Sequence, residues 1–277
     1  MTKTNEKYPC IQVDDTLDNV VLDNLDLYKY CDNGNDILCI SLIIAALYSN
    51  TTPVVITSSC KTICDCISIA IYGVPCSIIN FPTATSKMFK QADIQNAVAE
   101  EGLVLLRGVL GGINETNILD IIRGEDGRDF ANRIVIVCEA AEELQYVPKW
   151  FFNYAIGIDL ETCRLSKKTE GDFYTASDPT VTNKNANSEK NALELINPLK
   201  KVFPEIIPQL NARVSVIEIA NGIEEQLPVC KAIIKYDLLP ILRSIGMDDD
   251  EAISRIKSAR FSNFSAEELL ARLEADD

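Results

Sequence analysis

Lys61 and Thr62 are the residues whose chemistry is easiest to recognise, because they stand where a loop gives way to a helix in PVVITSSCKTICDCISIAIYG, residues 53–73. A phosphate-binding loop ends in such a pair: the lysine ammonium reaches the outer phosphates, and the hydroxyl holds magnesium. The N-terminus of the following helix adds its dipole. The pattern points to a nucleotide loop, and the competing interpretation is an ordinary lysine exposed to solvent at a helix start.

The loop before the lysine departs from a working phosphate loop. It contains no glycine, and it is about two residues shorter than the phosphate-loop motif requires. A residue with a side chain resists the positive φ angles that turn several N–H groups toward an anion. We therefore predict a degenerate nucleotide site, whose contacting residues are Ser58, Ser59, Cys60, Lys61 and Thr62.

Ten cysteines and no histidine limit the chemistry of the chain. The absence of histidine excludes Ser-His-Asp and Cys-His catalysis and every metal site that contains histidine. Cys60, Cys64 and Cys66 form a C-x3-C-x-C pattern, which raises the alternative of a metal site. On a helix the first two share a face while Cys66 points away. We expect no metal site here.

The acidic balance of the chain bears on its partners. There are 41 Asp and Glu residues against 26 Lys and Arg, a formal net charge of −15. Such a chain repels phosphate backbones, so we expect protein partners rather than nucleic acid. The first residues show no apolar signal region, and the longest apolar run, ILCISLIIAALY, is too short to span a bilayer. We expect a cytoplasmic protein with reduced thiols and no membrane span.

Short apolar runs alternate with helix-like segments over residues 1–165. Uninterrupted apolar strands with helices between them are typical of a parallel sheet that helices cover on both faces, an α/β fold. Residues 1–35 are polar and acidic, with only a weak apolar pattern. The expected strands are 54–57, 76–81, 103–108, 133–140 and 154–160, and the expected helices are 37–48, 63–72, 86–100 and 117–123.

The amino-acid composition of the chain changes near residue 166. Residues 166–189 are polar and nearly free of aliphatic side chains, so we expect a linker there. Residues 190–277 are predicted to form a small all-helical subdomain. In it Asp248 with Glu251, and Ser265 with Glu268, have the spacing of capping boxes. Pro240 should kink or divide a helix.

The order of these segments resembles the AAA+ family, the P-loop ring ATPases, in strongly diverged form. In that family a helix precedes the phosphate loop, as LCISLIIAALYSNTTPVVIT does here. A second strand should then end in two acids that bind magnesium and activate water. EEGLVLLRGVLGG resembles this segment, but Arg107 and Gly108 stand in place of the acids.

The later segments continue the resemblance. NRIVIVCEAAEEL is similar to a third strand that ends in a polar sensor residue, with Glu139 near that position. VPKWFFNYAIGIDL resembles the segment that carries an arginine to the neighbouring subunit's nucleotide, but Asn153 takes the arginine's place. Residues 190–277 would form the helical lid. In it Arg213 is the nearest equivalent of the family's phosphate-sensing arginine.

The departures from the family pattern imply that no ATPase cycle runs. An arginine in place of an acid inverts the electrostatics of the cation site, and the missing finger removes stabilisation of the transition state. The leading hypothesis is therefore a catalytically inactive AAA+-like subunit, a structural or scaffolding component of a larger protein assembly such as a homo- or hetero-oligomeric ring. This hypothesis requires no cofactor, although a site without magnesium could still take ATP.

Two other classes of function stay open. In a divergent ATPase, Lys61 and Thr62 would contact phosphates, and an acid from Glu100, Glu101 or Glu115 would replace the missing pair. The third class is an α/β binding module unrelated to ATPases, which a fold without a central strand leading into Lys61 would favour. The aromatic run Trp150, Phe151 and Phe152 is expected to pack in the core, the alternative being a partner anchor.

Overall fold

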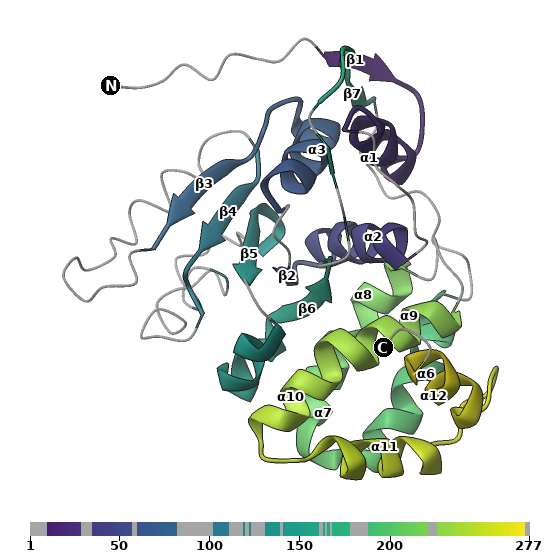
Figure 1. Cartoon of the computed structure of the whole chain (residues 1–277). Helices are drawn as coiled ribbons and strands as arrows, with labels where there is room; N and C mark the ends of the chain where they lie inside the picture. The colour runs from purple at the N-terminus through teal and green to yellow at the C-terminus, as the bar shows by residue number, and fades with distance from the viewer. Residues whose placement is uncertain are drawn as a thin grey trace.

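The computed structural model describes residues 10–28, 35–56, 60–81, 102–110, 119, 122, 131–138, 141–160, 163, 165–166, 168–177, 188–220 and 226–274. The chain folds into a parallel β-sheet flanked by helices, followed in sequence by a group of helices (Figure 1). The predicted α/β class with a helical C-terminal part is confirmed.

The main sheet has strands that follow the apolar runs of the sequence. β2 and β5 are buried along their whole length, because structure covers both faces of the sheet there. The strands are β2 (Thr52–Ile56), β3 (Ser77–Asn80), β4 (Val104–Arg107), β5 (Ile134–Cys138) and β6 (Ala155–Asp159). Their order is β3-β4-β5-β2-β6, and every neighbouring pair is parallel.

β2, the strand that precedes Lys61, is an interior strand with β5 on one side and β6 on the other. Its last residue, Ile56, lies level with Cys138 of β5 and Asp159 of β6. Arg107, the last residue of β4, pairs with Val137. The ends of these four strands therefore meet at one edge of the sheet, the carboxyl edge, where ligand sites of open α/β sheets form.

Helices α1 (Leu17–Asp26), α2 (Asn35–Tyr48) and α3 (Cys60–Tyr72) flank the sheet. α2 is apolar nearly throughout, because it packs against β2 and β6 as well as against the C-terminal helix α8 (Val214–Ala220). α3 packs against α1. The predicted helix 86–100 lies outside the described residues, and of the predicted helix 117–123 only residues 119 and 122, both helical, are described.

The segment expected as a linker, 166–189, contributes a strand to the fold. β7 (Phe173–Ala176) pairs in parallel with β1 (Cys10–Val13), and together they form a second small sheet. The fully buried amide of Asn24 closes the other edge of β7: its Nδ2 donates to the Tyr174 carbonyl at 2.9 Å, and its Oδ1 accepts from the Tyr174 N–H at 2.7 Å. The polar composition of this segment concealed a four-residue strand whose aromatic and β-branched residues suit a sheet.

Short helices make up most of the C-terminal part. They are α6 (Ser188–Val202), α7 (Ile207–Ala212), α8, α9 (Gln226–Ile233), α10 (Leu239–Ser244), α11 (Asp249–Ser258) and α12 (Ala266–Glu274). Single turns connect the elements: η1 (Ala131–Arg133), η2 (Ala141–Tyr146), η3 (Lys149–Asn153) and η4 (Pro204–Ile206) are 3₁₀-helical, and η5 (Ile234–Leu238) is π-helical.

The predicted caps are present in this part. Asp248 Oδ1 accepts the N–H of Glu251 at 2.7 Å at the start of α11. Ser265 and Glu268 form a reciprocal capping box at the start of α12, with N–H donors at 3.1 and 2.9 Å. Pro240 lies in the first turn of α10, immediately after the π-helical turn. The proline thus divides the α9–α10 rod, as predicted.

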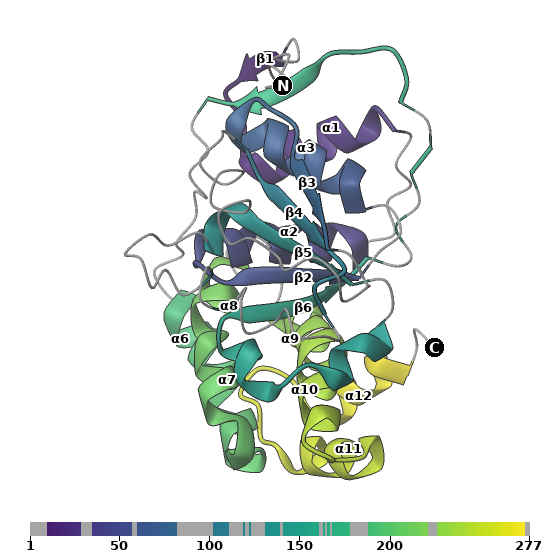
Figure 2. The ribbon, with the colours of Figure 1, turned by 90° about the vertical axis from the view of Figure 1, so that its left-hand side faces the viewer.

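The sheet and the C-terminal helices share one hydrophobic core. Ile156 of β6 and Ile217 of α8 belong to the same buried cluster, and η5 packs directly against β6. Figure 2 shows β6 as the strand of the main sheet that lies nearest the C-terminal helices. This edge of the sheet is therefore where the two parts of the chain meet.

Candidate functional site

The carboxyl edge of the sheet holds the residues expected to contact a nucleotide. α3 begins at Cys60, so Lys61 and Thr62 lie in its first turn, directly beyond the end of β2. The sequence predicted this position correctly. Ser58 and Ser59 lie outside the described residues, as does the side chain of Cys60.

Lys61 has an anionic partner on its own helix. Its ammonium group forms an ion pair with Asp65, one turn further along α3, while 47% of the lysine side chain stays exposed. The Asp65 carboxylate is held in place in turn, because its Oδ1 accepts from the N–H and from the thiol of Cys76, both at 3.0 Å. The lysine ammonium is thus paired with a carboxylate, from which a phosphate would have to draw it away. The i,i+4 spacing of Lys61 and Asp65 is the sequence signal that could have revealed this pair.

The end of β4 cannot carry a carboxylate at position 108. Gly108 has φ of +70°, and a Cβ at this position would lie 2.9 Å from the Phe81 carbonyl oxygen. Residues with a side chain rarely adopt this conformation and would collide with backbone here. Arg107 is half-buried, and its Nε makes no hydrogen bond to any residue in the described ranges. The positive charge of Arg107 therefore stands at the strand end that the resemblance to AAA+ proteins would assign to an acid.

Asp159 is a carboxylate at this edge that the sequence reasoning overlooked. It is the last residue of β6, lies level with Ile56 in the register, and is half-buried. An acid that ends an otherwise apolar strand was the available signal. Glu139, the expected sensor, lies outside the described residues, as do Glu100, Glu101 and Glu115.

No known protein family, curated protein or solved structure matches this chain. Its function must therefore be inferred from its own residues. Over the ranges that the structure describes, no helix is long and apolar enough to cross a membrane.

Of the cysteine pattern of α3, the structure describes the side chains of Cys64 and Cys66. Cys64 and Cys66 are both fully buried, and burial raises the pKa of the Cys66 thiol. A protonated, buried thiol is a poor metal ligand, because metals bind the thiolate. In the part of the chain that the structure describes, no group of three or more His, Cys, Asp or Glu side chains could hold a metal ion.

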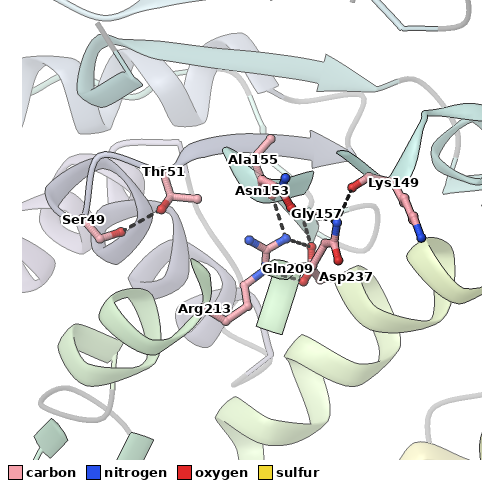
Figure 3. Close-up of polar contacts among 9 residues, drawn as sticks. All are labelled: Ser49, Thr51, Lys149, Asn153, Ala155, Gly157, Gln209, Arg213 and Asp237. Carbon is pink, nitrogen blue, oxygen red and sulfur yellow. Dashed lines mark hydrogen bonds and ion pairs between the residues drawn. The ribbon is translucent and has the colours of Figure 1, made fainter. Parts of the chain in front are cut away.

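Asn153, which the AAA+ resemblance would put at the position of the finger arginine, makes its contacts within the chain. Its Oδ1 accepts from Gln209 Nε2 at 2.8 Å, and the same Gln209 nitrogen donates to the Lys149 carbonyl at 3.0 Å (Figure 3). Gln209 is buried on α7, so these contacts connect the segment before β6 to the C-terminal helices. The side chain at position 153 supports the fold and carries no positive charge.

Arg213 is not close to the lysine whose bound phosphate it was expected to sense. It is 1% exposed and donates to Asp237 Oδ2 at 2.6 Å, to Asp237 Oδ1 at 2.9 Å and to the Ala155 carbonyl at 2.7 Å (Figure 3). Ala155 is the first residue of β6, whereas Lys61 lies beyond the last residue of β2. At about 3.3 Å per residue, the length of a five-residue strand separates the two positions by about 13 Å. At this position Arg213 stabilises the fold through its contacts with Asp237 and β6.

Asp237 is the residue that the sequence reasoning missed at this second location. It is 2% exposed and also accepts the N–H of Gly157 at 3.0 Å. Acidic side chains are almost never fully buried unless they are paired. A lone acid inside the apolar stretch of KYDLLP was therefore a signal for a buried partner, although the sequence does not say which one.

Proposed function

We propose that this chain is a catalytically inactive AAA+-like subunit that acts by contact, as a structural component of a larger cytoplasmic protein assembly. The position of β2 supports the AAA+-like part of the proposal. It is an interior strand that leads into Lys61 and α3, as expected of the strand before a phosphate loop. The helices after residue 188 correspond to the lid.

The observation that carries the inactive assignment is the geometry at Gly108. ATP hydrolysis in that family needs a magnesium ion held by acids at the end of the strand that corresponds to β4, which Gly108 follows. The left-handed backbone of Gly108 and the nearby Phe81 carbonyl leave no room for an acidic side chain there. The Lys61–Asp65 ion pair and the neutral Asn153 support the same conclusion from two other positions.

A divergent ATPase is the second candidate, and one observation favours it. Lys61 and Thr62 occupy the first turn of a 13-residue helix at the carboxyl edge. Asp159, the last residue of β6, lies level with Ile56 at the end of β2, so its carboxylate is the acid that would hold a cation in this candidate. This candidate requires that ATP displace Asp65 from Lys61.

Calorimetric titration with ATP and magnesium, together with a phosphate-release assay, separates the two candidates. For the inactive subunit we expect no phosphate release above the protein-free rate and no saturable heat. The matched variants are Lys61→Ala and Lys190→Ala, because Lys190 also pairs with a carboxylate at i+4, Glu194, but belongs to the exposed start of α6. Micromolar ATP binding together with phosphate release, both abolished by Lys61→Ala and preserved in Lys190→Ala, would establish the ATPase-like site and reject our proposal.

The contact surface of such a subunit is indicated by two exposed aromatic residues. Tyr146 is 73% exposed and Trp150 is 38% exposed, whereas their neighbours Phe151 and Phe152 are fully buried. The aromatic run that was expected to enter the core is therefore divided between core and surface. Tyrosine and tryptophan are the residue types that most often dominate the binding energy of protein interfaces.

Replacing Tyr146 and Trp150 together by alanine should release the chain from its assembly. We expect the tagged double variant to be recovered at the mass of the isolated chain instead of in a heavier native complex, while the melting temperature of the isolated chain changes little. Native mass spectrometry of tagged chain recovered from its own cells measures this. Ile11→Ala is the control, because Ile11 is 47% exposed on β1. An unchanged complex in the double variant would contradict this surface assignment.

A further inference from the structure

The outer edge of β6 is closed by side chains instead of by another strand. Among the strands that the structure describes, β6 has one neighbour, β2. The N–H of Thr52 donates to the Tyr154 carbonyl, and the N–H of Leu160 donates to the Ile56 carbonyl. Because successive residues of a strand alternate in direction, residues 155 and 157 turn their backbone groups away from β2. Those are the groups that Arg213 and Asp237 bind.

Arg213 and Asp237 together reproduce the hydrogen bonds of a missing strand. Arg213 donates to the Ala155 carbonyl at 2.7 Å, and Asp237 accepts from the Gly157 N–H at 3.0 Å. The two side chains also bind each other through two hydrogen bonds in a bidentate arrangement. We call this pair the edge clasp. Arg213 immediately precedes α8, and Asp237 lies in η5. Two separate segments of the C-terminal helices are therefore attached to residues 155 and 157 of β6 (Figure 3).

The backbone around the edge clasp is shaped for close approach. η5 is π-helical, with the N–H of Leu239 donating to the Ile234 carbonyl. Pro240 has no N–H and cannot make the α-helical bond to the Tyr236 carbonyl. That carbonyl lies against the sheet, where a Cβ on residue 157 would be 2.3 Å from it, so only glycine fits at position 157. Single π-turns in helices are often found at functional positions.

We propose that the edge clasp fixes the orientation of the C-terminal helices relative to the sheet, so that the helical part does not swing as a lid. Separating the two parts would break the hydrogen bond from Arg213 to the Ala155 carbonyl and the one from the Gly157 N–H to Asp237. Each of these bonds involves a charged side chain, and such bonds contribute more to stability than bonds between neutral groups. Gln209 adds a second connection from α7 to Lys149 and Asn153. The chain thus presents one unchanging surface to its neighbours. The inference concerns the chain's own residues and holds whether or not nucleotide binds.

Hydrogen exchange under increasing guanidinium, below the unfolding midpoint, tests the proposal on the unaltered protein. If the orientation of the C-terminal helices is fixed, peptides from α8 and α10 and peptides from β5 and β6 should open in one event, with the same denaturant dependence. If the C-terminal helices opened first, as a separate unit, the proposal would be wrong. Labelling with ¹⁵N-glycine gives at most 12 glycine amide signals. Among them, the signal of the Gly157 amide reports on the edge clasp directly.

The variant Asp237→Ala should turn this one opening event into two. We expect the Gly157 amide to exchange at least about tenfold faster, the loss of one hydrogen bond to a charged group, and the helices to open before β5. The matched control is Asp249→Ala, which breaks another bidentate Arg–Asp pair, Arg243–Asp249, that lies at the surface. A folded Asp237→Ala protein that still opens in one event would overturn the proposal. If this variant does not fold, the measurement on the unaltered protein decides alone.

Discussion

Replacing Arg213 by alanine should lower the free energy of unfolding by about 3–5 kcal/mol, the range for removing one partner of a buried ion pair. The physical reason is the Asp237 carboxylate, which is 2% exposed and would keep a single hydrogen bond, from the Gly157 N–H. The Ala155 carbonyl would lose its donor as well. Urea unfolding followed by circular dichroism measures the change, with the slope compared between proteins to detect a loss of cooperativity.

Two further variants identify the cause of that loss. Arg243→Ala breaks the surface pair with Asp249, whose side chains are 39% and 46% exposed, and should cost only ~0.2–1 kcal/mol. The double variant Arg213→Met with Asp237→Leu removes both charges and should recover much of the stability that Arg213→Ala loses, because no buried charge is then left alone. A loss below about 1 kcal/mol in Arg213→Ala would show that solvent reaches Asp237 and would contradict the buried clasp.

The second large effect is expected for Gly157→Ala, which should destabilise the protein by ~3 kcal/mol or more through overpacking. The added Cβ would lie 2.3 Å from the Tyr236 carbonyl oxygen and 3.3 Å from the Leu144 side chain. A backbone carbonyl cannot rotate away as a side chain does, so η5 must retreat from β6. The hydrogen bond from the Gly157 N–H to Asp237 would then lengthen. Thermal unfolding and amide exchange at residue 157 both report this.

Gly246→Ala is the control that isolates the steric term. Gly246 has φ of +85° after α10, but a Cβ there would have no neighbour within 4 Å. Its replacement should therefore cost only the backbone strain, ~1–2 kcal/mol. Gly157→Ala with an equal or smaller cost than Gly246→Ala would mean that η5 does not press on β6 as the structure describes.

Much of the fold could be predicted from local patterns in the sequence. Continuous apolar runs located the strands of the main sheet within a few residues, because a strand covered on both faces needs apolar side chains at every position. The start of α3 at Lys61 and the caps at Asp248 and Ser265 followed from short-range chemistry. β1 and β7 were missed because their sequences, CIQV and FYTA, are not continuous apolar runs, and β7 lies in a polar segment.

The candidate site was predictable only in part. Sequence comparison with the family's order of segments placed Lys61, Arg107 and Gly108 at strand ends, and the structure brings the ends of β2, β4, β5 and β6 to one edge. The structure does not bring Arg213 to that edge. The residues around an arginine near a helix start do not indicate which distant groups the arginine will contact. Its partner Asp237 is 24 residues away in the sequence, and Ala155, whose carbonyl Arg213 binds, is 58 residues away.

The sequence by itself determined where the strands of the main sheet lie, and it determined that the loop before Lys61 lacks glycine and the chain lacks histidine. Those properties depend on residue type and on neighbours a few positions apart. The tertiary structure decided that Lys61 is paired with an anchored aspartate, that position 108 has no space for an acid, and that Arg213 and Asp237 close the edge of β6. These outcomes depend on free space and on charges from distant segments, which only the packed chain defines.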